Sequence, residues 1–292
     1  MSILDRIAAA PISWGVCEVP GWGAQMPPAR VLSEMRELGI EATEAGPDGY
    51  LGADPDGAAA LVREYGLRLV GGFVPTVLHR PGALEPVERA ARLFATAGAD
   101  VLVVAAETGA AGYDARPQLS DDEWSTLLEG LDRAQEICAA HRLRCALHPH
   151  VGTLVERPAE IDRVLERSTV DLCLDTGHLV IGGNDPVELA RRAAERVSHV
   201  HLKDVEGIVA ARVLAGTQSY SDAVRDGLYV PLGAGSVDMA EFVAVLERAG
   251  YRGWYVLEQD AMLDAQPPED GGPIGDVRAS LDFLRSVLQP AA

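Results

Sequence analysis

Short apolar runs alternate with longer amphipathic segments along the chain, and the alternation continues from one end to the other. We predict strands at the apolar runs 8–16, 40–45, 67–74, 100–105, 143–149, 170–175, 197–202 and 253–258. Apolar residues at i, i+3 and i+4 predict helices at 27–38, 54–66, 84–98, 121–140, 158–168, 186–196, 237–249 and 276–288. This repeated strand and helix pattern in 292 residues predicts an α/β protein, a (β/α)8 barrel that forms a single domain over residues 1–292.

A doubly wound open sheet is the main competing fold, because it also alternates strands and helices. That fold carries a glycine-rich phosphate-binding turn after its first strand, where this chain has Trp14-Gly15-Val16. We therefore favour the closed barrel. Residues 204–236 form a long connection, and since such connections often cover an active site, we expect this one to do so.

Composition narrows the classes of function. A hydrophobic content of 48% with 24% charged residues is typical of a soluble globular protein. The formal net charge of -19 argues against binding to nucleic acid or to an anionic membrane surface. No apolar run approaches the ~20 residues of a membrane span, and no signal peptide is evident, so we expect a cytoplasmic protein. Four scattered cysteines without a CxxC pair argue against disulfides and structural zinc.

Polar residues gather at the ends of three consecutive predicted strands. The three runs are CALHPH at 145–150, LCLDTGH at 172–178 and VSHVHLKD at 197–204. Strand alternation places His148 with His150, and His199 with His201, on the same side of their strands. A histidine satisfied in a core is the usual explanation for one such residue. A cluster of this size indicates instead a metal or catalytic site.

The polar residues that end the fifth to eighth strands form a candidate metal site. They are His148, Asp175, His201 and Glu258. The carboxyl ends of barrel strands meet at one mouth, so two imidazoles and two carboxylates should converge there. Mixed nitrogen and oxygen ligands suit Mn, Co, Fe, Mg or Zn and leave positions open for substrate oxygens. Taken alone, Asp175 could be a helix N-cap and Glu258 a solvated acid.

Lys203 is the only lysine in the chain, which carries 25 Lys and Arg residues in total. A surface position would be the ordinary explanation. A lysine kept where arginine is otherwise used suggests a need for a compact ammonium rather than a planar guanidinium. Near a divalent metal we expect its pKa to be lowered, so that it carries a proton or stabilises an enolate.

Several motifs resemble the xylose isomerase-like, or sugar phosphate isomerase/epimerase, TIM barrels. They are LDTGH at 174–178, HVHLKD at 199–204, PLGAGSVD at 231–238 and GWYVLEQD at 253–260. The likeness spans nearly the whole chain. Within this family the chain looks most like inosose dehydratases, on APISWGVCEVPGWG at 10–23, EATEAGPDGYLG at 41–52 and HPHVGTLVE at 148–156.

The resemblance implies a divalent metal held by His148, Asp175, His201 and Glu258. Most of the family has a glutamate where His148 stands, so the ligand charge is lower here and Mn, Co or Fe are favoured over Mg. It remains open whether His148 binds the metal or the substrate. The resemblance also makes His150 an acid or base, with Lys203 as its partner in proton transfer.

Four further residues could contribute to the site. Glu44, at the end of the second strand, can reach the mouth and act on a substrate hydroxyl, unless it caps a helix. His178 is expected to fix Asp175 or a hydroxyl. Trp14 and Trp22 could form a flat wall for a sugar or cyclitol ring, although core packing is the safer interpretation of Trp14.

These inferences predict a lyase that dehydrates a polyhydroxylated cyclic ketone through a metal-stabilised enolate, with 2-keto-myo-inositol (scyllo-inosose) as the expected substrate. One alternative is an isomerase or epimerase of keto sugars or sugar phosphates, which would return the proton to carbon. Another is a metal-dependent sugar-binding barrel without turnover. The expected partner is a small polyol ketone or sugar, and a homo-oligomer is compatible with the sequence.

Overall fold

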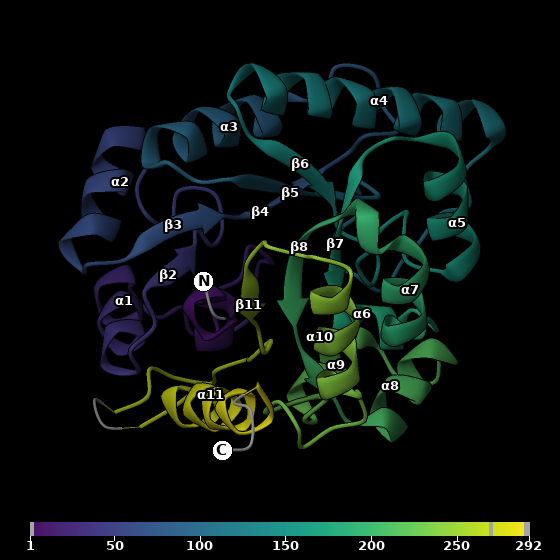
Figure 1. The fold of residues 1–292 in the computed structure, drawn as a ribbon. Coiled ribbons are helices and arrows are strands. Elements are labelled where there is room, and N and C mark those ends of the chain that lie inside the picture. Colours follow the sequence, from purple (N-terminus) through teal and green to yellow (C-terminus); the bar gives the residue numbers. More distant parts are fainter. Residues whose placement is uncertain (1–2, 269–270, 289–292) are drawn as a thin grey trace.

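The computed structural model describes residues 3–268 and 271–288. Within them, parallel strands form one sheet in the order β3-β2-β1-β11-β8-β7-β6-β5-β4 (Figure 1). The strands are β1 (Ile7–Ala9), β2 (Ala42–Glu44), β3 (Arg68–Gly71), β4 (Phe73–Thr76), β5 (Val101–Ala106), β6 (Arg144–Leu147), β7 (Asp171–Asp175), β8 (Val197–Leu202) and β11 (Tyr255–Leu257). They are apolar and almost entirely buried, as expected for parallel strands covered on both faces.

The sheet closes into a barrel at the predicted strand 67–74, which is interrupted at Gly72. Its first half, β3, pairs with β2, whereas its second half, β4, pairs with β5. A Cβ at Gly72 would lie 2.7 Å from the Phe94 ring and 3.1 Å from the Ala45 Cβ. Glycine therefore lets the strand pass between these neighbours as it changes partner. The predicted (β/α)8 barrel is confirmed.

Helices surround the barrel (Figure 1). They are α1 (Pro28–Glu37), α2 (Pro55–Glu64), α3 (Glu85–Ala97), α4 (Asp121–Ala140), α5 (Pro158–Arg167), α6 (Thr176–Ile181), α7 (Pro186–Ala193), α10 (Met239–Arg248) and α11 (Ile274–Leu288). Several begin with proline, whose missing N–H is not needed in the first turn. At α4, Ser120 and Glu123 form a capping box.

The first strand is shorter than the predicted 8–16. It ends at Ala9, and a 3-10 helix, Pro11–Trp14, follows. Pro11 has no N–H to donate to a neighbouring strand, and its fixed φ suits a helical turn. Two other 3-10 helices, Leu4–Arg6 and Ala194–Arg196, precede β1 and β8.

The long connection 204–236 contains secondary structure of its own. It consists of β9 (Asp204–Val205), α8 (Gly207–Leu214), α9 (Tyr220–Arg225) and β10 (Tyr229–Val230). β9 and β10 pair antiparallel, so the two ends of the segment between them lie together. The carboxylate of Asp204 accepts hydrogen bonds from the backbone N–H groups of Gly233, Gly235 and Val237 at 2.9 to 3.0 Å. These bonds fix the glycine-rich stretch that follows β10.

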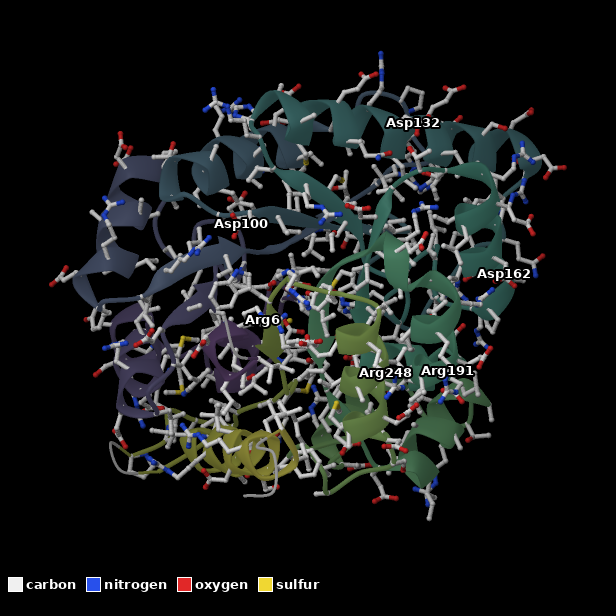
Figure 2. The ribbon with its side chains drawn as sticks, in the orientation of Figure 1. Arg6, Asp100, Asp132, Asp162, Arg191 and Arg248 are labelled. Atoms are coloured by element: carbon white, nitrogen blue, oxygen red, sulfur yellow. The ribbon has the colours of Figure 1, made fainter. Side chains whose placement is uncertain are left out.

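The N-terminal end of the barrel contains a buried arginine. Arg6 is 3% exposed and donates to both carboxylate oxygens of Glu247 at 2.7 and 2.8 Å, and to the Gly253 carbonyl at 3.1 Å. It lies within the ring of helices, whereas Asp132 and Arg191 extend outward from theirs (Figure 2). Among the described residues, no helix combines the length and apolar character needed to cross a membrane.

Candidate metal centre and active site

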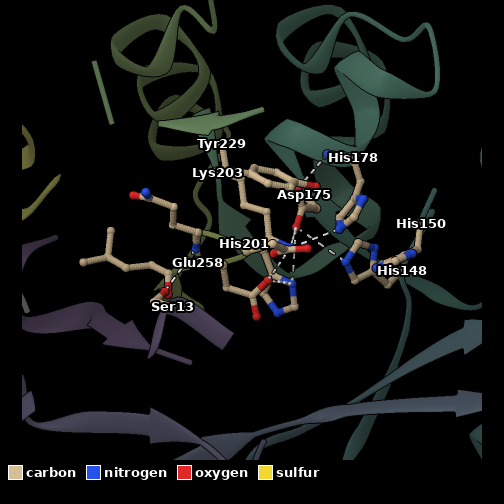
Figure 3. A network of polar contacts seen from close by, with 12 residues as sticks. Ser13, His148, His150, Asp175, His178, His201, Lys203, Tyr229 and Glu258 are labelled. Atoms are coloured by element: carbon tan, nitrogen blue, oxygen red, sulfur yellow. Dashed lines mark hydrogen bonds and ion pairs between the residues drawn. The ribbon is translucent and has the colours of Figure 1, made fainter. Parts of the chain in front are cut away.

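The predicted metal-binding side chains converge at the C-terminal end of the barrel (Figure 3). His148 follows β6, Asp175 ends β7, His201 lies in β8 and Glu258 follows β11. Asp175 Oδ2 lies 3.5 Å from His148 Nε2 and 3.7 Å from His201 Nδ1, and His201 Nδ1 lies 3.3 Å from Glu258 Oε2. All four side chains are buried. Residues from four strands therefore meet at one point, as the sequence predicted.

Two atoms at this point show that a cation fits. Asp175 Oδ2 and His201 Nδ1 are buried and have no hydrogen-bond partner. A buried carboxylate oxygen or imidazole nitrogen without a partner is costly. Both are atoms that bind divalent transition metals. Their separation from each other and from His148 Nε2 allows one ion to contact all three.

Hydrogen bonds to the other ring nitrogens leave the correct lone pairs available. His148 Nδ1 lies 2.8 Å from the Pro149 carbonyl, which can only accept, so Nδ1 carries the proton and Nε2 is free to bind an ion. His201 Nε2 lies 3.0 Å from Glu44 Oε1, so Glu44 accepts from Nε2, and Nδ1 is the nitrogen that faces Asp175 and Glu258. His148 is therefore competent as a metal ligand.

Glu44 lines the cavity and also contacts two histidines. Its Oε1 also lies 2.7 Å from His199 Nε2, so one oxygen accepts from two imidazoles. Burial raises the pKa of Glu44, but His201 and His199 lower it well below its usual range. Glu44 thus orients His201, and its expected action on a substrate hydroxyl stays a prediction.

Two other groups of potential ligands lie nearby. One comprises Glu44, His199 and His201, and the other comprises His148, His150 and His178. The first is already joined by internal hydrogen bonds. In the second, the rings of His150 and His178 are stacked with centroids 3.7 Å apart. The group around Asp175 is the better candidate cation site, because Asp175 Oδ2 and His201 Nδ1 make no hydrogen bond.

Lys203 is buried beside the candidate metal site. Its Nζ lies 2.6 Å from Asp260 Oδ1, 3.0 Å from Glu258 Oε2 and 3.5 Å from Asp175 Oδ2. It also lies 3.0 Å from His178 Nε2. Burial lowers the pKa of Lys203, but Asp175, Asp260 and Glu258 raise it well above its ordinary value. These surroundings keep the ammonium charged, and the lowering of its pKa expected beside a divalent metal stays a prediction.

Asp260 links Lys203 to the long connection 204–236. Its Oδ2 accepts a hydrogen bond of 2.6 Å from the Tyr220 hydroxyl, which lies 3.0 Å from that of Tyr229. Sequence reasoning missed Asp260 and gave Tyr220 no role. Strand alternation could have found Asp260, because it lies two residues after Glu258 on the same side. The contact with Tyr220 confirms that the long connection reaches the site.

His150 and His178 lie next to each other beside His148 (Figure 3). His150 Nδ1 lies 2.7 Å from the Val151 carbonyl, so this nitrogen carries a proton and Nε2 has a free lone pair. Burial is the main cause that lowers the pKa of His150, and that of His178, well below the usual value. Asp175 also caps α6, as the N-cap alternative predicted, because its Oδ1 accepts from the His178 backbone N–H at 2.9 Å. Tyr113 packs against His150 with ring centroids 4.8 Å apart.

A cavity of about 450 Å³ opens onto these residues. His148, His150, His201, Lys203 and Glu258 line its inner end. The two tryptophans predicted to form a wall are placed differently. Trp22 lines the cavity, and its indole N–H donates to the Ala261 carbonyl at 2.9 Å. Trp14 is fully buried and does not line it, because its indole N–H donates to Glu34 at 2.7 Å within the core.

The sequence pattern that defines the xylose isomerase-like TIM barrels matches residues 32–287. The chain belongs to this family. The inosose dehydratase of Geobacillus kaustophilus (strain HTA426) is 36% identical over 270 residues, which cover 87% of each chain. The rhizopine catabolism protein MocC of Rhizobium meliloti is 35% identical over 284 residues, covering 92% of this chain and 84% of MocC.

Solved structures of other proteins have the same fold as this chain. The IolI protein with a binding zinc atom has a TM-score of 0.72 at 12% identity and covers 97% of this chain and 98% of its own. Membership of the xylose isomerase-like family confirms the resemblance inferred from the sequence motifs. The relatives named inosose dehydratase also support the predicted enzyme class, a lyase.

Proposed function

We propose that this protein is a dehydratase that uses a divalent metal to remove water from a polyhydroxylated cyclic ketone, most specifically 2-keto-myo-inositol (scyllo-inosose). The observation that carries the proposal is that Asp175 Oδ2 and His201 Nδ1 are buried without a hydrogen bond, beside a cavity lined by His150 and Lys203. The inosose dehydratase at 36% identity supports the choice of reaction. The relative with a zinc atom supports a divalent metal, with Mn, Co, Fe and Mg also compatible with the ligand types.

The metal would be held by His148, Asp175, His201 and Glu258, and when bound it would supply a Lewis acid for the substrate carbonyl. His150 Nε2, with its free lone pair, takes the proton from the carbon beside the carbonyl. The electron pair of that C–H bond forms a new C=C bond to the next ring carbon, as the bond from that carbon to its hydroxyl oxygen breaks. Lys203 gives its proton to the departing hydroxyl, which leaves as water.

Direct assay of the product tests this function. Metal-free protein is loaded separately with Mn²⁺, Co²⁺, Fe²⁺, Mg²⁺ or Zn²⁺, incubated with scyllo-inosose or with a panel of keto sugars, and the products are identified by mass spectrometry. Loss of one water from scyllo-inosose supports the proposal. A new isomer of unchanged mass would indicate a keto-sugar isomerase or epimerase, and binding without any change would indicate a sugar-binding protein.

The variant His150→Gln tests the proposed proton transfer. The variant keeps a side chain of similar length but has no basic nitrogen, so we expect it to bind the metal and to lose at least ~10²-fold in dehydration rate. Metal content measured by mass spectrometry separates this loss from a loss of the metal. Undiminished dehydration by His150→Gln would remove His150 from the mechanism.

A further inference from the structure

The cavity extends well beyond the residues that carry out the proposed chemistry. Its outer part lies between the connection that follows β2 and one side of α3. Ala45, Pro47, Leu51, Ala90, Leu93 and Phe94 line it, and none of them belongs to the candidate metal site. We call this the outer pocket.

The volume is larger than an unsubstituted ring ketone requires. At about 450 Å³, the cavity is in the range of ~300–1,000 Å³ that encloses drug-sized ligands, whereas a cyclohexane polyol has only about a dozen non-hydrogen atoms. A ring held against His150 and Lys203 at the inner end would therefore leave the outer pocket without substrate atoms.

The chemistry of the outer pocket favours an uncharged group. Its walls are mainly aliphatic and aromatic carbon. Among the charged residues that line the cavity there, Arg89 donates to Asp48 at 2.9 Å and to Glu85 at 2.8 Å, so its charge is balanced. Arg92 is exposed. A phosphate would have to compete with two carboxylates for Arg89, whereas an alkyl or alkoxy group gains contact with the apolar wall.

We propose that the outer pocket binds an uncharged, apolar substituent on the substrate ring, so that the preferred substrate is an ether or alkyl derivative of the ring ketone. This inference rests on the proposed function for the position of the ring. Each methylene that leaves water for the pocket contributes roughly 0.8 kcal/mol, which corresponds to about fourfold in kcat/KM. A propyl ether should therefore exceed the unsubstituted ketone by about tenfold or more.

Two variants on α3 test the pocket. Ala90 is half-buried and lines the outer pocket, so Ala90→Phe should fill it. Ala95 serves as the control, because it is half-buried on the same helix and does not line the cavity. We expect Ala90→Phe to remove the tenfold preference for the propyl ether while the unsubstituted ketone reacts at the wild-type rate. Ala95→Phe should keep the preference. If Ala90→Phe does not fold, Leu51→Ala, which removes part of the wall, should reduce the preference.

The affinity for both ketones is also measured by calorimetry. This measurement separates the proposal for the outer pocket from the proposed dehydratase function. If neither ketone is dehydrated, the proposed function is wrong, and the binding ratio still tests the pocket. Equal kcat/KM and equal affinity for the two ketones in the wild type would overturn the inference. A preference for a phosphorylated ketone, or identical behaviour of Ala90→Phe and Ala95→Phe, would also overturn it.

Discussion

Replacing Glu44 with glutamine should weaken divalent metal binding about tenfold in a protein that still folds. The carboxylate is buried, and its Oε1 accepts from His201 Nε2 at 3.0 Å and from His199 Nε2 at 2.7 Å. Glutamine keeps the size and an accepting oxygen but loses the charge. A hydrogen bond to a charged group contributes about 1.5–3 kcal/mol and a neutral one about 0.5–1.5, so His201 loses roughly 1–1.5 kcal/mol of support. That difference is about tenfold in Kd.

Titration of metal-free protein with Mn²⁺, followed by calorimetry or by competition with a fluorescent chelator, measures this change. Glu34→Gln is the control, because Glu34 is also buried but accepts from Trp14 and Arg30, each at 2.7 Å, away from the cavity. It should lower stability and leave the Kd unchanged. A wild-type Kd for Glu44→Gln, or an equal loss in Glu34→Gln, would refute the view that Glu44 orients a metal ligand.

Three other substitutions or conditions give measurable outcomes. Lys203→Met should retain the metal by elemental analysis and lose at least ~10²-fold in kcat, and wild-type turnover would exclude Lys203 from proton transfer. Burial raises the pKa of Glu258 to about 7, so protons compete with the cation below that pH. Mn²⁺ should therefore raise Tm more at pH 8 than at pH 6, and equal shifts would contradict Glu258 as a ligand. Arg6→Met should lower the free energy of unfolding in urea by about 2 kcal/mol, because partly buried Glu247 loses its partner. The exposed Arg191 is the control, and Arg191→Met should lower it by under about 1 kcal/mol. Similar losses in both variants would contradict this account.

The barrel and the centre of the site could be predicted from the sequence for the same reason. Strand alternation and the meeting of parallel strand ends are general rules, and they bring His148, Asp175, His201 and Glu258 together whatever the details of the loops. The break of the third strand at Gly72 could not be predicted, because it depends on which neighbour each half of the strand pairs with.

Residues whose roles depend on tertiary contacts were harder to place. Glu44 was correctly located near the mouth, but its pairing with His199 and His201 joins β2 to β8, which are separated in the sheet by β1 and β11. Trp14 has the sequence position of a cavity wall, yet its indole turns to Glu34 in the core. Asp260 could have been noticed by its spacing from Glu258. No local pattern reveals its bond with Tyr220, which comes from a separate segment.

The pairing of β9 with β10 has a practical consequence for protein engineering. Because Val205 faces Tyr229 across this ribbon, the chain leaves the barrel and returns to it at nearly the same place. Exchange of residues 206–228 between homologous enzymes would therefore keep the two junctions together, provided that the buried residues of the segment still fit those they pack against. Such chimaeras would change the hydroxyl group presented to Asp260 while the scaffold that holds the cation stays the same.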